Sequence, residues 1–325
     1  MALSTQYSEP LAAAQDFVIP KIHDIAYHPK DLVTFYWLNK HCRSTKFKSG
    51  EYVHAPVLDV VTDNSVELAI GTEAIPTETV QEFDRVKLPW HLRAQPVVMT
   101  LKDRKMIAGN GPNRVFDMWA AKLKSAAKSL RKKVANDILN NTSTTAGKYV
   151  GLKYACSDYG GTVDVTSYGG ITIGAADDTL DPVEDATNTT LTLTAMEDLW
   201  VKLDGETQFI VTTPTLFGKY WGKVQPQQRF TDGDLASAGF KNLMFNSAPV
   251  TFDRQVPTKY MYYLSAGSDD EKYMYFFVHP EFDFAFENTA ETLPNQAISV
   301  ARFYFGGQLL VPGRNRQGCF SLLAG

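Results

Sequence analysis

The stretch between residues 113 and 139 constrains the fold of this chain more than any other, because its pattern predicts one very long helix. Neither Gly nor Pro falls between Asn113 and Leu139. About 26 residues at 1.5 Å each make a rod of roughly 40 Å, well over twice the usual helix length. Trp119 is the largest side chain expected in its buried face. That face is predicted from apolar residues spaced by three and four: Val115, Trp119, Leu123, Ala126, Leu130, Val134 and Ile138.

Both ends of this helix carry recognisable signals. Asn110-Gly111-Pro112-Asn113 predicts its start, since proline suits the first helical turn. Asn140-Asn141 predicts a left-handed stop. One face is basic, which we interpret as a solvated surface, with nucleic-acid contact as the alternative; it carries Lys122, Lys124, Lys128, Arg131, Lys132 and Lys133.

Composition limits the classes of protein to consider. The chain has 325 residues, 44% of them hydrophobic and 21% charged, which is near the average for globular proteins. This length predicts roughly two domains or one elaborate domain. The 32 Lys and Arg against 36 Asp and Glu give a net charge of −4, which argues against a dedicated nucleic-acid binder. Wholesale disorder, fibres and disulfide-rich mini-proteins are excluded.

Cysteine usage and terminal composition predict a soluble chain in a reducing compartment. Cys42, Cys156 and Cys319 are widely separated, and no pair has the Cys-x-x-Cys spacing of a metal or redox site. Residues 1–14 lack a basic leader followed by an apolar run, so we expect no secretory signal. No run of 18 apolar residues predicts a membrane helix.

The N-terminal third is predicted as an arm followed by a projecting hairpin. Residues 1–45 contain one short helical stripe, over 31–41, and prolines that prevent a core of their own. Residues 46–101 are rich in β-forming segments, at 53–61, 66–70 and 79–99. Pro89 and Pro96 are typical of edges or bulges. We therefore expect a long strand pair with polar faces that buries little against its own domain.

The second half mixes helices and strands. Thr194-Ala195-Met196-Glu197 predicts a capped helix that ends at Gly205, followed by a buried strand over 208–213 and a short helix over 215–221. Strands are predicted at 240–245 and 250–252 around Asn246-Ser247, at 260–264 and 273–278 around a polar turn, and at 298–305 and 308–311 around Gly306-Gly307. The acidic run over 177–185 lacks calcium-loop spacing and is predicted to be an exposed loop. The fold class is α+β (mixed α/β).

No catalytic, cofactor-binding or metal site is predicted. Arg114 stands where a dinucleotide fingerprint needs its third glycine, and neither a phosphate-binding loop nor a Gly-x-Ser-x-Gly elbow occurs. Cys42 beside His41 is interpreted as a buried thiol rather than a nucleophile. Zinc-site spacing is absent among the six histidines, which are His23, His28, His41, His54, His91 and His279. We expect a protein that is not an enzyme and that needs no cofactor.

The order of a projecting loop, one long helix, a Tyr-Gly-Gly-Ile turn, a second helix and a hairpin resembles the major capsid proteins of tailed bacteriophages, which share the Hong Kong 97-type fold. The resemblance covers roughly residues 50–325. It rests on short motifs that occur in a set order before and after the predicted helix that contains Lys122: Glu82-Phe83-Asp84, Leu101-Lys102-Asp103-Arg104-Lys105, Asn110-Gly111, Ser167-Tyr168-Gly169-Gly170-Ile171, Gly239-Phe240-Lys241-Asn242-Leu243-Met244-Phe245, Ala248-Pro249-Val250 and Asp253.

The resemblance implies a division of the chain into five parts. These are an N-terminal arm (1–45), an extended loop with flanking strands (46–101), a peripheral domain (102–191) with its spine helix (113–139), an axial domain (192–286), and C-terminal strands that return to the peripheral domain (287–325). In the family the extended loop laps over a neighbouring subunit. A fused scaffold segment is not expected.

The resemblance also implies a structural function. Subunits would self-assemble into hexamers and pentamers that form the icosahedral head of a phage and enclose its double-stranded DNA. The implied partners are other copies of the chain, a scaffolding protein, a portal, a decoration protein and packaged DNA contacted without sequence preference, with no membrane. Assembly would take place in the host cytoplasm and the product would be the virion capsid. The alternatives are an encapsulin-type cellular shell of the same fold and, third, an α/β enzyme.

Overall fold

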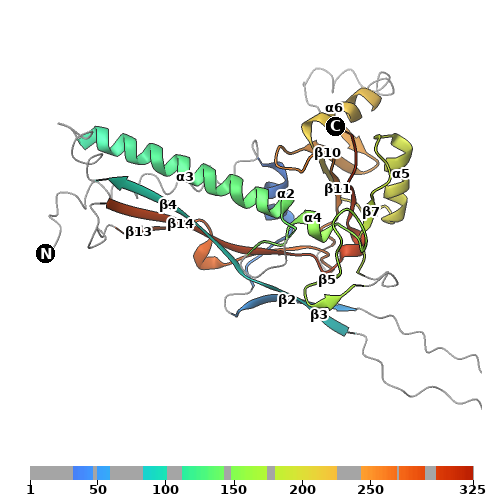
Figure 1. The fold of residues 1–325 in the computed structure, drawn as a ribbon, viewed down its shortest axis with the longest axis horizontal. Helices are drawn as coiled ribbons and strands as arrows, with labels where there is room; N and C mark the ends of the chain where they lie inside the picture. The colour runs from blue at the N-terminus through green and yellow to red at the C-terminus, as the bar shows by residue number, and fades with distance from the viewer. Residues whose placement is uncertain are drawn as a thin grey trace, which may run out of the picture.

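The computed structural model describes residues 32–46, 50–58, 83–100, 112–142, 148–173, 180–224, 243–268, 271–289 and 298–324. The side chains of Leu58, Phe83, Met99, Thr100, residues 112–121, Asn288, Thr289, Ile298 and Ser299 are outside the description as well. The arm residues 1–31, the strand predicted at 66–70, Gly239-Phe240 and the side chain of Trp119 therefore lie outside the described residues. Figure 1 shows a long helix lying along one sheet, a second sheet flanked by shorter helices, and a strand pair set apart from both.

The first sheet carries the long helix. Its strands are β1 (Arg43–Ser44), β12 (Tyr275–Val278), β14 (Ile298–Leu310) and β13 (Ala285–Thr289) in that order, and β4 (His91–Thr100) pairs with β14 in antiparallel register. The long helix α3 (Pro112–Asn140) packs on β4 and β14 (Figure 1). An ion pair of 2.5 Å between Arg93 and Asp137 joins β4 to α3. Helix α2 (Val33–His41), which the sequence predicted over 31–41, leads into β1.

Helix α3 confirms the predicted long helix, and its described side chains confirm the predicted buried apolar stripe. It begins at Pro112, as the start signal indicated. The correction concerns Arg131, which the sequence placed on the solvated basic face. Arg131 is only 2% exposed, and it lines a cleft together with residues of strand β10 (Ala248–Phe252). The stripe members that are described are all buried: Leu123, Ala126, Leu130, Val134 and Ile138.

The predicted left-handed stop of α3 is wrong. Neither Asn140 nor Asn141 has a positive φ. Their amide side chains hold the helix end instead: the Nδ2 of Asn140 donates to the carbonyl of Gln255 at 2.7 Å, and the Nδ2 of Asn141 donates to the carbonyl of Tyr149. Gly151 packs so close to this end that a Cβ there would stand 2.6 Å from the carbonyl of Asn141. Tertiary contacts therefore replace a local cap.

The second sheet lies between two hydrophobic cores. Its strand order is β7 (Val183–Asp185), β15 (Gly318–Phe320), β11 (Met261–Leu264), β8 (Phe209–Thr212), β10 and β9 (Leu243–Phe245). Successive residues of β8 belong to different cores, with Phe209 and Val211 facing the α3 side and Ile210 facing helices α5 (Leu193–Lys202) and α6 (Pro214–Val224). This is the alternation of a strand buried on both faces. The predicted strand at 208–213 is confirmed.

Helix α5 starts two residues before the predicted capping box. Thr192 is its N-cap, and its hydroxyl accepts a hydrogen bond of 3.1 Å from the nitrogen of Ala195, whereas Thr194 lies within the helix. The short helix predicted at 215–221 is confirmed as α6. The hairpin around Asn246-Ser247 is also confirmed, since β9 and β10 pair in antiparallel register.

Gly306-Gly307 does not form the predicted turn. β14 runs straight through both glycines, pairing with β4 on one side and with β12 on the other. A Cβ at position 307 would stand 2.7 Å from the carbonyl of Phe277, and one at position 306 would stand 3.0 Å from the Cβ of Phe282. The glycines thus permit close approach of neighbouring chain rather than a reversal.

Two further expectations change with the sheet topology. The strands predicted around a polar turn, β11 and β12, belong to different sheets and do not pair as a hairpin. Asp177 and Asp178 lie outside the described residues, but Glu184 and Asp185 lie in β7, which pairs in parallel with β15. Glu184 accepts hydrogen bonds from the nitrogens of Asp158 and Thr162 at 3.0 and 3.1 Å. This part of the acidic run is structural and is not an exposed loop.

Candidate assembly surfaces

The base of the projecting hairpin is anchored on the body of the protein. Strands β2 (Tyr52–Leu58) and β3 (Phe83–Pro89) pair in antiparallel register, and β3 continues into β4 (Figure 1). One face of the pair is apolar and buried, through Val53, Ala55, Val57, Val86 and Leu88. The expectation of polar faces that bury little is therefore wrong for the base of the hairpin. Residues 59–82, which would form its tip, lie outside the described residues.

A two-residue turn receives the hairpin base. Tyr168 pairs with Ile171 across Gly169-Gly170, whose φ values are +60° and +96°. Positive φ at both central residues defines the type I′ turn, which favours glycine. The nitrogen of Lys87 donates to the carbonyl of Gly169 at 2.8 Å. A Cβ on Gly169 would overlap the Val86 side chain, so only glycine lets the two hairpins approach this closely.

The face of β4 that points away from α3 is apolar and exposed. Leu92 is 50% exposed and Val98 is 44% exposed, and Ala94 and Pro96 between them are exposed as well. We call these four residues the β4 apolar face. The alternate residues His91 and Val97 are buried toward the core. Exposed apolar side chains that line up along a strand mark an interaction surface more often than scattered ones do.

The exposed face of α3 has the opposite character. Within Lys122–Asn140 its exposed residues are all polar, and none is acidic: Lys124, Ser125, Lys128, Ser129, Lys132, Lys133 and Asn136. We call this set the α3 lysine face. A cleft of about 490 Å³ separates Lys128 and Lys132 from Arg254, which lies just after β10. Buried Asp253 in this cleft accepts hydrogen bonds from the nitrogens of Thr34 and Gln255 at 3.1 and 2.9 Å.

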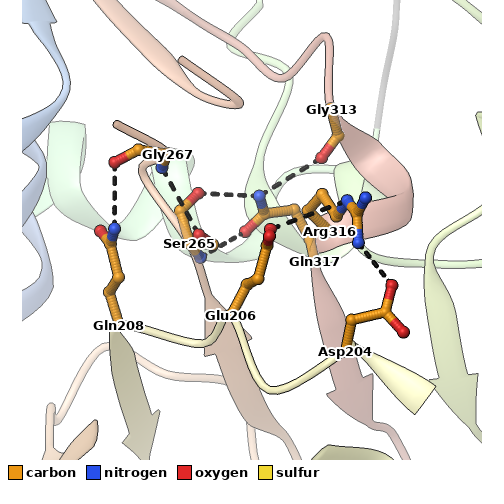
Figure 2. A network of polar contacts seen from close by, with 8 residues as sticks. All are labelled: Asp204, Glu206, Gln208, Ser265, Gly267, Gly313, Arg316 and Gln317. Atoms are coloured by element: carbon orange, nitrogen blue, oxygen red, sulfur yellow. Dashed lines mark hydrogen bonds and ion pairs between the residues drawn. The ribbon is translucent and has the colours of Figure 1, made fainter. Parts of the chain in front are cut away.

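A polar network fixes the connection between the two sheets (Figure 2). The buried side chain of Gln317 accepts from the nitrogen of Ser265 at 2.9 Å and donates to the carbonyl of Ser265 at 2.9 Å and to that of Gly313 at 3.3 Å. Nearby, Arg314 in the short helix η4 (Arg314–Arg316) donates to the carbonyl of Ala155 at 3.0 Å. The segment that leaves β14 for β15 is therefore held in one conformation.

The outer part of the same network involves charged side chains. Arg316 forms an ion pair of 2.6 Å with Asp204 and lies 3.8 Å from a carboxylate oxygen of Glu206 (Figure 2). Gln208 donates to the carbonyl of Gly267 at 3.0 Å. These residues come from the α5–β8 and β11–β12 connections and from η4. These contacts join η4, which follows β14 of the first sheet, to the loops beside β8 and β11 of the second sheet.

None of the cysteines is placed for chemistry. All three are free and buried. Burial raises the pKa of Cys42 and of Cys156 to about 12 and raises that of Cys319 well above its usual value. A neutral thiol is a poor nucleophile. The interpretation of Cys42 as a buried thiol is confirmed.

The four described histidines are dispersed, and His23 and His28 lie outside the described residues. His91 is buried with its ring 4.1 Å from that of Tyr149, His41 and His54 are on other elements, and His279 accepts from the nitrogen of Glu281. Within the residues that the structure describes, no group of three His, Cys, Asp or Glu side chains could hold a metal ion. No described helix is long and apolar enough to cross a membrane.

Comparison with known proteins identifies the fold through structure alone. No protein-family model matches the chain, and no curated protein matches it in sequence. The capsid asymmetric unit of cyanophage A-1(L) matches with a TM-score of 0.68 at 14% identity, over 88% of this chain and 92% of that chain. The capsid of Myoviridae phage XM1 matches with a TM-score of 0.56 at 11% identity, over 88% and 90%.

A third match is to a cellular shell. The holo-SrpI encapsulin complex of Synechococcus elongatus PCC 7942 has a TM-score of 0.56 at 9% identity, over 88% of this chain and 87% of that chain. The fold of this chain is therefore the α+β fold of these shell-forming proteins. More specifically, it is the fold of phage major capsid proteins, so the Hong Kong 97-type resemblance of the sequence is confirmed for the fold.

Sequence reasoning missed two surfaces. Pro89 and Pro96 favour an edge hairpin, so the β4 apolar face was not predicted. The alternation from Leu92 to Val98 is the signal that places the apolar residues on one side of the strand. The contact between Gly169 and β3 joins residues far apart in the sequence, and no local pattern encodes it.

Proposed function

We propose that this chain is a major capsid protein that self-assembles into hexamers and pentamers and forms the icosahedral head of a tailed bacteriophage around double-stranded DNA. The observation that carries the proposal is the capsid fold over 88% of the chain, with a TM-score of 0.68 to the capsid asymmetric unit of cyanophage A-1(L). The exposed β4 apolar face supports it, because such a face is stabilised when a second subunit covers it.

The five-part division of the chain is retained as part of the proposal. The arm (1–45) and the extended loop (46–101) would contact neighbouring subunits, the peripheral domain (102–191) would carry the spine helix, and the axial domain (192–286) would surround the capsomer axis. Residues 287–325 would return to the peripheral domain. The described sheets depart from these boundaries: β12, within 192–286, pairs with β14 in the sheet that carries α3, and β15, within 287–325, pairs with β11 in the second sheet.

The proposed partners follow from the same function. Other copies of the chain come first, and scaffolding, portal and decoration proteins would join during assembly in the host cytoplasm. The product would be the virion capsid. An encapsulin-type shell is the second candidate, favoured by the likeness to the SrpI encapsulin with its TM-score of 0.56. Native particles that contain DNA and a portal would separate the phage head from an encapsulin.

The β4 apolar face gives a direct test of assembly. A variant with Leu92→Asp and Val98→Asp should keep its fold, because both side chains are exposed, and should fail to form closed shells. A matched variant with Leu92→Met and Val98→Ile keeps the face apolar and should assemble. Circular dichroism and negative-stain microscopy would be applied to the same preparations. Normal shells from the aspartate variant would contradict the assignment of this face as a subunit contact.

A further inference from the structure

The α3 lysine face has a composition that discriminates between classes of partner. It combines four lysines with two serines and one asparagine, and it exposes no apolar or aromatic side chain within Lys122–Asn140. The half-buried Asp137 pairs with Arg93 at 2.5 Å and so adds little free negative charge. Cores of protein–protein contacts are poor in lysine and serine and rich in aromatic residues, methionine and arginine. This face is therefore unlike a protein-binding surface and unlike the β4 apolar face.

Its donors suit phosphate groups. Lysine ammonium, serine hydroxyl and asparagine amide groups are among the common contacts to nucleic-acid phosphates, which fix position without reading sequence. Single-stranded nucleic acid is usually held by rows of stacking aromatic side chains. The α3 lysine face itself exposes none, and the cleft beside it has one exposed aromatic side chain, Phe252. The chemistry therefore favours the backbone of a duplex.

The spacing of the lysines agrees with such a backbone. Lys124, Lys128 and Lys132 are four residues apart and form one row along the helix, with about 6 Å between neighbours. Alternate phosphates of one DNA strand are about 7 Å apart along the helix axis. Arg254 extends the positive charge across the cleft from Lys128 and Lys132, so the surface involves a second element besides α3. Because the net charge of the chain is −4, electrostatic attraction to DNA has to come from a locally basic surface such as this one.

We propose that the α3 lysine face, together with Arg254, binds the phosphodiester backbone of duplex DNA without sequence preference. The proposal rests on the proposed function for the source of that DNA, which is the enclosed genome. In a shell it places the α3 lysine face on the side of the subunit that meets the DNA.

The test measures binding of the unassembled subunit to a fluorescent 20-base-pair duplex by anisotropy between 50 and 200 mM NaCl. Each phosphate contact contributes about 0.9 to the slope of log affinity against log salt. A triple variant, Lys124→Gln with Lys128→Gln and Lys132→Gln, should lower that slope by about 2.7. The ratio of wild-type to variant affinity should therefore fall by about 40-fold between 50 and 200 mM NaCl.

Two control proteins define the result. Three exposed lysines elsewhere, changed as Lys40→Gln, Lys202→Gln and Lys223→Gln, remove the same charge and should leave the slope nearly unchanged. The triple Lys→Arg variant of the α3 lysine face should bind as the wild type does. Equal losses from the two glutamine variants, or wild-type binding by the α3 variant, would overturn the proposal. Binding of poly-glutamate but not of duplex DNA would also overturn it and would assign the face to an acidic protein partner.

Shell formation is scored separately on the same variants. Wild-type protein that forms shells but does not bind DNA would refute the inference and leave the shell function standing. Protein that binds DNA through the α3 lysine face but never forms shells would refute the proposed function and leave the surface assignment standing. Normal shells from the α3 glutamine variant are expected, because exposed lysines contribute little to folding.

Discussion

The contact between Gly169 and the hairpin base supports a quantitative prediction. Gly169 has a φ of +60°, and a Cβ there would overlap the Val86 side chain and stand 3.0 Å from the nitrogen of Lys87. Gly160 has a similar φ of +70°, but a Cβ there would meet nothing within 4 Å. Alanine substitutions at Gly160 and Gly169 therefore separate the loss of stability due to a left-handed backbone from the loss due to a steric overlap.

The magnitudes follow from these two situations. Gly160→Ala should lower the free energy of unfolding by about 1–2 kcal/mol, which is the cost of placing an L side chain in the left-handed region. Gly169→Ala carries the same cost and adds about 1–3 kcal/mol for overpacking against β3. The second variant should also shift the hairpin base, and hence the loop that the base carries.

Urea unfolding of the unassembled subunits, followed by intrinsic fluorescence, measures the difference between the two variants. Particle yield by microscopy then tests the connection to assembly, and Gly169→Ala should give fewer closed shells than Gly160→Ala at equal amounts of folded protein. If the two variants were equally stable and assembled equally well, the reasoning about hairpin anchoring would be refuted.

Three other predictions concern the helices and a buried thiol. Thr192→Ala should cost about 1 kcal/mol of stability because it removes the α5 N-cap, whereas Thr194→Ala should cost less; urea unfolding of both would show whether Thr192 is the cap. Leu130→Ala in the buried stripe should cost about 2–5 kcal/mol, while Lys128→Ala should change stability by less than about 0.5 kcal/mol, and equal effects in the same assay would contradict the orientation of α3. The Cys42 pKa rises from 9.0 unfolded to about 12 folded, so its contribution to stability is complete below pH 9 and is lost between pH 9 and 12. Unfolding free energy should fall over that range, and a fall of the same size in Cys42→Ala would exclude this thiol as a cause.

Local pattern predicted the elements whose signals are local. Helix α3 follows from an uninterrupted apolar period, and β8 follows from a short apolar run ended by a proline. Gly306-Gly307 was misread because glycine pairs signal turns locally, while their role in β14 is set by Phe277 and Phe282 on neighbouring chain. Tertiary contacts decide whether a glycine pair forms a turn or lies within a strand, and a single sequence does not reveal those contacts.

The same distinction holds for the surfaces. The lysines of α3 were predicted to share a face with Arg131, but Arg131 is buried where it lines the cleft beside β10. Helical periodicity does not report burial of this kind. The β4 apolar face was predictable in principle from alternation, yet which side of the strand meets the core depends on where α3 packs. The capsid-type fold itself was inferred from the order of several weak motifs along the chain.

The central claim is that copies of this chain close into a shell. Cryo-electron microscopy of the purified protein, produced together with a scaffolding protein, tests it most directly. The account predicts closed icosahedral particles built from hexamers and pentamers, with the β4 apolar face covered by a neighbouring subunit. A compact monomer that persists at high concentration under these conditions, seen by analytical ultracentrifugation as a single slow species, would contradict it.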